Sequence, residues 1–190
     1  KELYNSAVFI EKGAVRNIIK KGLLPDYDVF DEYRYFEPNK RFDCITLNGV
    51  KIALTVCEDL WDDDEGGNSY VGDPMAELRK ENPDLLINIA ASPFSYTHFN
   101  KRGKVLSQQV KKSNCPLIYV NQVGAHMDII FDGRSLALNS EGAKVAELKR
   151  FEDDLQYVTY QQKNITSTTA PTQDPVPEIA LIHDALILGL

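Results

Sequence analysis

Three apolar runs of strand length, separated by segments with helical character, constrain the fold of this chain more than any other feature. The runs cover residues 50–56, 85–90 and 116–121 and are rich in aliphatic and β-branched side chains, which is typical of buried strands. Helices are predicted over residues 73–80 and 103–113. Because strands alternate with helices, the sequence predicts an α/β fold.

Turn residues divide the rest of the chain into hairpins and a carboxyl-terminal segment. Three hairpins are predicted, over residues 6–19, 42–56 and 134–148. The second is centred on Asn48-Gly49, which is a strong hairpin-turn signal. Residues 161–177 are rich in Thr, Gln, Pro and Ser, a composition that predicts a linker. The apolar segment 178–190 then predicts the first turns of a helix.

Composition and charge argue against several classes of function. No apolar run is long enough to span a membrane, and a formal net charge of −7 disfavours nucleic acid as a partner. The three histidines are far apart in the sequence, so no metal site is predicted. Three cysteines without metal-like spacing indicate free thiols in a reducing compartment, which predicts a cytoplasmic protein.

Cys57 is the strongest candidate for a chemical role. It follows the apolar run 51–56, and the carboxyl end of a strand is where open α/β sheets place their ligands. The alternative is a small buried hydrophobic residue, which is what most single cysteines are. A cysteine nucleophile needs a cation or base nearby. Lys21 ends another apolar run and is a candidate for that cation, although most lysines in such places are exposed to solvent.

A series of motifs follows along the chain. They are Lys21-x-x-Leu24-Pro25-x-Tyr27, Val29-Phe30-Asp31-Glu32-x-Arg34-Tyr35-Phe36, Thr55-Val56-Cys57-Glu58-Asp59-Leu60-Trp61, Ala91-Ser92-Pro93-Phe94, Tyr119-Val120-Asn121-Gln122-Val123-Gly124 and Phe131-Asp132-Gly133-x-Ser135. In this order and at these spacings they resemble the glutaminase domain of glutamine-dependent NAD+ synthetases, a branch of the nitrilase superfamily of carbon-nitrogen hydrolases. The resemblance covers residues 3–155.

The resemblance implies a fold and a domain organisation. The fold would be a nitrilase-like α-β-β-α sandwich that pairs with a second copy, so a homo-oligomer is expected. Residues 1–160 would form this domain, here without its first strand and helices. Residues 161–177 would be the linker, and residues 178–190 would begin an ATP-dependent synthetase domain.

The resemblance also implies a mechanism, because nitrilase-type amidases use a Glu, a Lys and a Cys. Cys57 corresponds to the nucleophile that attacks the side-chain amide of glutamine and forms a thioester. Lys21 corresponds to the cation that favours the thiolate and stabilises the oxyanion, together with a backbone N–H just after Cys57. The ammonia would serve a fused synthetase that converts nicotinic acid adenine dinucleotide to NAD+ with ATP and Mg²⁺. No cofactor is expected in residues 1–190 themselves.

Further positions would bind glutamine. Glu58 would pair with the α-ammonium group by charge. The positions that line the pocket in this family correspond to Tyr27, Trp61 and Ser92. For Trp61, simple core packing is an equal alternative. The basic partner of the α-carboxylate stays open among His98, Lys101 and Arg102.

One part of this mechanism has no counterpart upstream of Lys21. The general base in this family is a glutamate from an amino-terminal segment, and neither Glu2 nor Glu11 has the matching flanking sequence. We therefore expect that residues 1–190 alone do not hydrolyse glutamine. Glu32 is a candidate for a second, structural acid near the catalytic residues.

Two alternative functions remain open. A stand-alone nitrilase-type amidase acting on another ω-amide or carbamoyl substrate would use the same cysteine, but it would not need a linker and an entry helix. A catalytically inactive interaction domain would keep the fold without turnover. Labelling of Cys57 by a reactive glutamine analogue distinguishes both from a glutaminase.

Overall fold

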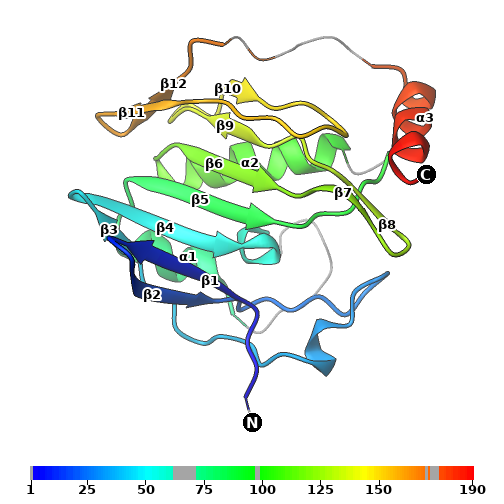
Figure 1. The fold of residues 1–190 in the computed structure, drawn as a ribbon. Helices are drawn as coiled ribbons and strands as arrows, with labels where there is room; N and C mark the ends of the chain where they lie inside the picture. Colours follow the sequence, from blue (N-terminus) through cyan, green and yellow to red (C-terminus); the bar gives the residue numbers. More distant parts are fainter. Residues whose placement is uncertain (1, 62–71, 97–98, 170, 172–175) are drawn as a thin grey trace. The chain divides into compact units, whose positions relative to one another are not determined.

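A computed structural model describes residues 2–61, 72–96, 99–169, 171 and 176–190 of the chain (Figure 1). The chain forms two compact units, Lys1–Ile89 and Ala90–Leu190. Both units combine strands with helices, so the predicted α/β class is confirmed.

The first unit contains two antiparallel hairpins and one parallel strand pair. Its strands are β1 (Ser6–Glu11), β2 (Ala14–Lys20), β3 (Ile45–Leu47), β4 (Val50–Val56) and β5 (Leu85–Ala90). β1 pairs with β2 and β3 pairs with β4, as the turn residues predict. β5 runs parallel to β4, and parallel neighbours need a crossover connection, which here includes helix α1 (Pro74–Lys80).

Helix α1 begins where its sequence signals place it. The Asp73 side chain accepts a hydrogen bond from the Ala76 backbone N–H at 2.8 Å, and Pro74 occupies the first turn, where its missing N–H costs nothing. Met75 and Leu78 on this helix are 1% exposed and pack into the core. A hydrogen bond at the amino-terminal ends of β4 and β5 supports their register. Asp84, just before β5, accepts it from the Lys51 backbone N–H at 2.9 Å.

Two short 3-10 helices lie among the described residues of the first unit, within the motifs described above. Residues 23–40 form an irregular segment apart from η1 (Glu32–Arg34). η2 (Cys57–Leu60) begins directly after the last residue of β4. The irregular segment 23–40 and the end of β4 therefore carry the residues that matter for the site.

The second unit contains helix α2 and a set of short antiparallel strands. Its elements are α2 (Phe99–Ser113), β6 (Leu117–Asn121), β7 (Val123–His126), β8 (Ile129–Asp132), β9 (Leu136–Leu138), β10 (Lys144–Glu147), β11 (Thr159–Gln161), β12 (Asn164–Thr166) and α3 (Glu178–Leu188). β9 pairs antiparallel with both β6 and β10. β7 pairs with β8, and β11 pairs with β12.

The structure corrects three details of the secondary-structure prediction. α2 begins at Phe99, four residues before the predicted start at residue 103. The β7–β8 hairpin was not predicted, because its turn around Met127 has no glycine and Met127 itself takes a positive φ of 51°. The segment predicted as a linker from residue 161 instead begins with the β11–β12 hairpin, because Ile165 within it is completely buried.

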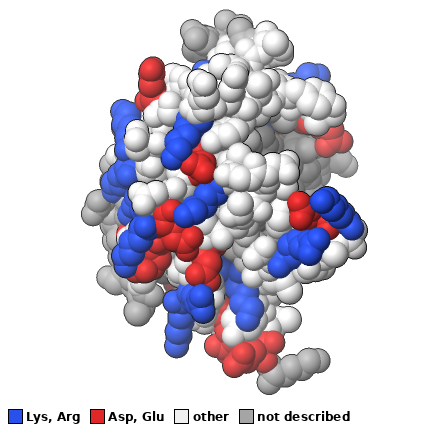
Figure 2. Space-filling view, turned by 90° about the vertical axis from the view of Figure 1, so that its left-hand side faces the viewer, with Lys and Arg blue, Asp and Glu red and all other residues white. Residues whose placement is uncertain are grey.

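Charges on the surface are mixed in sign. On the face drawn in Figure 2, Lys and Arg side chains lie interspersed with Asp and Glu side chains. None of the helices in the described ranges is long and apolar enough to cross a membrane. In the same part of the chain, no group of three or more His, Cys, Asp or Glu side chains is placed to hold a metal ion.

Candidate active site

Cys57 lies at the carboxyl end of β4 in a strained backbone conformation. Its φ is +46°, in the left-handed region, which costs a residue with a Cβ about 1–2 kcal/mol. Such strain persists only where neighbouring groups enforce it, and it clusters at functional sites. Here the buried Asn88 amide donates hydrogen bonds to the Cys57 carbonyl at 3.2 Å and to Thr55 Oγ1 at 2.9 Å. Asn88, on the neighbouring strand β5, therefore holds the turn that carries the Cys57 thiol.

Lys21 is buried, so the alternative of an exposed strand-end charge is wrong. Its side chain is only 1% exposed, and its Nζ contacts Glu32 Oε1 at 2.6 Å. A buried ammonium needs a partner of this kind, because desolvation of a lone charge is costly. Asn5 donates a longer hydrogen bond of 3.4 Å to the other oxygen of Glu32. Glu32, a candidate for an acid near the predicted catalytic residues, thus forms a direct ion pair with Lys21.

The Asp59 carboxylate lies between the Lys21 loop and the end of β4. One of its oxygens accepts hydrogen bonds from the backbone N–H groups of Gly22 and Leu23, both at 2.8 Å, and the other accepts from Val56 N–H at 3.3 Å. The side chain is 1% exposed. Burial raises the pKa of Asp59 to about 6, while these hydrogen bonds and the Lys21 charge oppose the rise.

Glu58 and Tyr27 form a second polar pair. The Tyr27 hydroxyl donates to Glu58 Oε1 at 2.8 Å, and Glu58 is 7% exposed. Burial, and then the negative charge of Glu58, hold the pKa of Tyr27 well above its ordinary value, so the hydroxyl stays a donor. Trp61 follows η2, half-buried, and its backbone N–H donates to the Glu58 carbonyl at 2.8 Å. The ring of Tyr27 also packs edge-on against Phe30, with centroids 5.7 Å apart.

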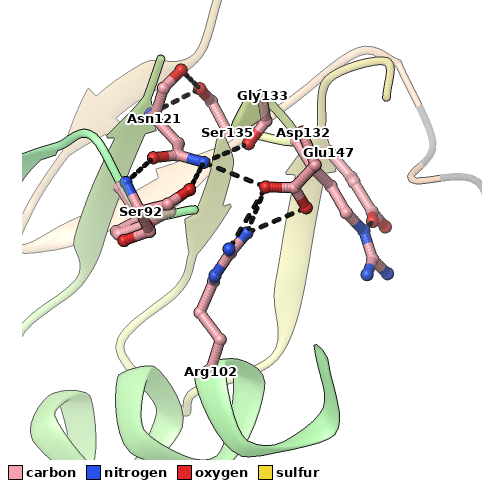
Figure 3. A network of polar contacts seen from close by, with 9 residues as sticks. Ser92, Arg102, Asn121, Asp132, Gly133, Ser135 and Glu147 are labelled. Carbon is pink, nitrogen blue, oxygen red and sulfur yellow. Dashed lines mark hydrogen bonds and ion pairs between the residues drawn. The ribbon is translucent and has the colours of Figure 1, made fainter. Parts of the chain in front are cut away.

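In the second unit, Ser92 is held by an asparagine (Figure 3). Asn121 Oδ1 accepts from the Ser92 backbone N–H at 2.8 Å, and Asn121 Nδ2 donates to the Ser92 carbonyl at 3.4 Å. The same Nδ2 lies 2.9 Å from the Gly133 carbonyl and 3.2 Å from Asp132 Oδ1. The Tyr119 hydroxyl lies 2.9 Å from Ser92 Oγ. Three separate motifs of the sequence therefore meet around one buried amide.

The predicted basic residues after Ser92 have different positions. Arg102, on α2, makes several contacts of 3.1 Å with both carboxylate oxygens of Asp132, and Figure 3 shows its guanidinium group facing that residue. Both side chains are largely buried, at 12% and 5% exposed. Arg102 is therefore engaged in a structural ion pair, which disfavours it as the partner of a substrate carboxylate. Lys101 precedes it on the same helix, and His98 lies outside the described residues.

A similar ion-pair cluster lies beside this network. Glu147, at the end of β10, contacts both Arg134 and Lys144, and its side chain is 4% exposed. Desolvation lowers the pKa of Arg134 to about 10, against the favourable contact with Glu147. This cluster joins β10 to the segment before β9 and carries no residue that the sequence singled out for chemistry.

The structure brings some of the predicted site residues together and adds others. Lys21 meets Glu32, and Tyr27 meets Glu58, within the first unit. The contacts made by Asp59, Asn88 and Asn121 were not predicted from the sequence. Asp59 and Asn121 do lie inside the quoted motifs, and their place in those motifs was the only available signal.

The comparisons with known proteins follow the same lines. The sequence model of the family described as carbon-nitrogen hydrolase matches residues 1–170. A glutamine-dependent NAD+ synthetase of Synechocystis is 39% identical over 193 residues, which cover 100% of this chain and 35% of that protein. The chain thus spans about a third of the length of this curated relative.

Solved structures give the same result. The structure of a glutamine-dependent NAD+ synthetase from Acinetobacter baumannii, in complex with ADP, matches 97% of this chain with a TM-score of 0.86 and 28% identity, and the match covers 34% of that chain. A carbon-nitrogen hydrolase from Helicobacter pylori matches 79% of this chain and 54% of its own, with a TM-score of 0.69 and 25% identity.

Fold and site together define a mixed α/β protein of the nitrilase-like type, with a strained cysteine at a strand end and a buried lysine–glutamate pair. The chain belongs to the carbon-nitrogen hydrolase family.

Proposed function

We propose that this chain is the glutamine-hydrolysing part of a glutamine-dependent NAD+ synthetase, with Cys57 as its nucleophile. The observation that carries the proposal is the buried Lys21, whose loop is hydrogen-bonded through Asp59 to the strand end that precedes the strained Cys57. The relatives that match the whole chain are named for the same activity, which supports glutamine over other amides as the substrate.

The proposed chemistry is acyl transfer through sulfur. The Cys57 thiolate attacks the side-chain amide carbon of glutamine, and the positive charge of Lys21 stabilises both the thiolate and the oxyanion of the tetrahedral intermediate. The C–N bond breaks, the nitrogen gains a proton and ammonia leaves, so that a thioester remains on sulfur. Water then attacks the thioester, releasing glutamate and restoring the thiol. The general base for these proton transfers is not assigned to any residue of this chain.

The polar pairs around the cysteine would hold the ends of the substrate. Glu58 is buried and negatively charged, which suits the α-ammonium group of glutamine. Tyr27 orients the Glu58 carboxylate through the 2.8 Å hydrogen bond. Trp61 and Ser92 are proposed as further glutamine-binding residues. For the α-carboxylate, Lys101 and His98 remain the candidates, because Arg102 is engaged with Asp132.

The activity of the whole protein is a further part of the proposal. Ammonia from this chain would serve a synthetase that amidates nicotinic acid adenine dinucleotide, with ATP and Mg²⁺ bound by that synthetase and not by the residues described here. Pairing with a second copy through the nitrilase-like fold is proposed with it.

Covalent labelling with 6-diazo-5-oxo-norleucine tests the nucleophile and the substrate together. We expect the full-length protein, and not residues 1–190 alone, to gain one adduct on Cys57, found by peptide mass spectrometry, and excess glutamine to block it. A Cys57→Ser variant should gain none. Cys44 and Cys115 are internal controls, because Cys115 is buried and burial, together with Glu81, raises the pKa of Cys44 to about 12.

Two outcomes of this experiment would overturn the proposal. An adduct on Cys57 that glutamine does not block, but another ω-amide does, would make the protein an amidase of different specificity. No adduct on any cysteine would favour an inactive domain that keeps the fold.

A further inference from the structure

We propose that Asp59 is a positioning residue for this chemistry: its carboxylate fixes the loop that carries Lys21 against the turn that carries Cys57. This inference rests on the proposed function, because it assigns to Asp59 the task of holding the proposed cation and the proposed nucleophile in one arrangement. Asp59 itself does not touch the substrate in this account.

Asp59 accepts hydrogen bonds from the residues next to Lys21 and Cys57 in the sequence. Gly22, which donates to Oδ1, directly follows Lys21, and Val56, which donates to Oδ2, directly precedes Cys57. The two backbone segments therefore lie on opposite oxygens of a single buried carboxylate. A shift of either segment would lengthen at least one of these hydrogen bonds, so the position of the lysine relative to the cysteine depends on this side chain.

The charge state and burial of Asp59 fit this task. An ionised carboxylate is an acceptor at both oxygens, whereas an amide of the same shape offers only one acceptor atom. Asp59 is 1% exposed and accepts all three hydrogen bonds from backbone N–H groups. With a pKa of about 6 it is ionised near neutral pH in spite of its burial. Asparagine at this position would turn an N–H group toward one of the backbone donors.

The pH dependence of Cys57 alkylation by iodoacetamide tests the inference, because its midpoint reports the pKa of the thiol without requiring turnover. Loss of the negative charge alone, in Asp59→Asn, would favour the thiolate and lower that pKa. Loss of the positioning would move Lys21 away and raise the pKa by about 1 unit, the lower end of the effect of a nearby opposite charge. The two accounts thus predict shifts of opposite sign.

Lys21→Met and the double variant Lys21→Met/Asp59→Asn complete the experiment. If Asp59 acts through Lys21, Asp59→Asn should cause no further rise once Lys21 is gone. Asp84→Asn is the matched control, since Asp84 also accepts a backbone hydrogen bond, from Lys51 at the opposite end of β4. This control should leave the midpoint for Cys57 unchanged.

The outcomes separate the two levels of the proposal. A midpoint that falls or stays the same in Asp59→Asn, or that rises equally with and without Lys21, overturns the positioning role. If Asp59→Asn does not fold by circular dichroism, Asp59→Glu keeps the charge but displaces the acceptors, and the same rise is expected. Failure of 6-diazo-5-oxo-norleucine to label the unsubstituted protein overturns the proposed function, while the iodoacetamide series still decides whether Asp59 positions Lys21.

Discussion

The left-handed backbone at Cys57 makes a prediction that does not depend on activity. Glycine normally destabilises a protein relative to alanine, but at a φ of +46° the Cβ is the source of the strain. We expect Cys57→Gly to be more stable than Cys57→Ala by about 1 kcal/mol in urea unfolding. At Lys104, which is exposed in helix α2, the alanine variant should be more stable than the glycine variant, as is usual in helices. Alanine ahead at both positions would contradict the strained conformation.

The Lys21–Glu32 pair predicts a strong coupling in stability. Glu32→Gln leaves a buried ammonium without an ionised partner, which typically costs about 3–5 kcal/mol. The double variant Lys21→Met/Glu32→Gln removes both charges and should unfold at a higher urea concentration than Glu32→Gln alone. As a control, Glu152→Gln breaks an exposed pair with Lys149 and should change the free energy of unfolding by less than about 0.5 kcal/mol.

Asp59 predicts a dependence of stability on pH. Its pKa is raised from 3.8 to about 6 in the folded protein, so the folded state binds this proton more tightly than the unfolded state does. Its contribution to stability is therefore full below pH 3.8 and is lost as the pH rises through 6. We expect the free energy of unfolding of Asp59→Asn to rise, relative to that of the unsubstituted protein, between pH 4 and pH 7. A constant difference across this range would contradict the raised pKa.

At the scale of residues, the sequence singled out charged groups more readily than the groups that hold them in place. Lys21, Tyr27 and Glu58 stand in motifs whose resemblance suggested roles, and the structure places them in polar contacts. Asp59 accepts a hydrogen bond from the backbone N–H of Gly22, 37 residues away, and Asn121 accepts one from the backbone N–H of Ser92, 29 residues away. Such partners follow from the tertiary fold and not from local residue patterns, so no periodicity or spacing could reveal them.

At the scale of elements, hairpins and strands with clear turn signals were predicted well. β4 and the first hairpin lie beside the turn residues Asn48-Gly49 and Gly13. β5 follows the turn residues Asn82-Pro83-Asp84. β12 was missed because a strand made of Asn, Ile and Thr inside a Thr-rich and Gln-rich segment has the composition of a linker. Burial of one side chain decided the outcome there, and burial is not visible in composition.

Ile165 allows this correction to be tested. It is 0% exposed, and loss of a fully buried isoleucine side chain typically costs about 2–5 kcal/mol. We expect Ile165→Ala to lower the free energy of unfolding by an amount in that range, measured in urea. The neighbouring Thr166→Ala, at an exposed position of the same strand, should change it by less than about 0.5 kcal/mol. Equal and small effects would contradict the packing of Ile165 and favour a linker that begins at residue 161, as predicted for residues 161–177.

At the scale of the whole chain, the resemblance over residues 3–155 predicted the family, and the family match over residues 1–170 confirms it. This success rested on the order and spacing of several motifs and not on composition. The β11–β12 hairpin overlaps the start of the predicted linker, and the division of the chain into a domain, a linker and an entry helix stays a prediction. The helix expected at its end is present as α3.

The β1–β2 hairpin makes the last prediction, which concerns association of the molecule. Val8 and Ile18 are cross-strand partners, as are Ile10 and Val15, and all four side chains are 50–60% exposed. A contiguous apolar surface of this kind favours contact with another protein surface, and between identical chains it favours self-association.

We expect the sedimentation coefficient of this 190-residue chain to rise with concentration. In Val8→Thr/Ile18→Thr, which keeps β-branched side chains on the strands, the rise should be smaller. Leu155→Thr, at a position 75% exposed outside this hairpin, is the matched control and should behave as the unsubstituted chain. An equal effect of both changes would show that general surface hydrophobicity, and not this hairpin, drives the association.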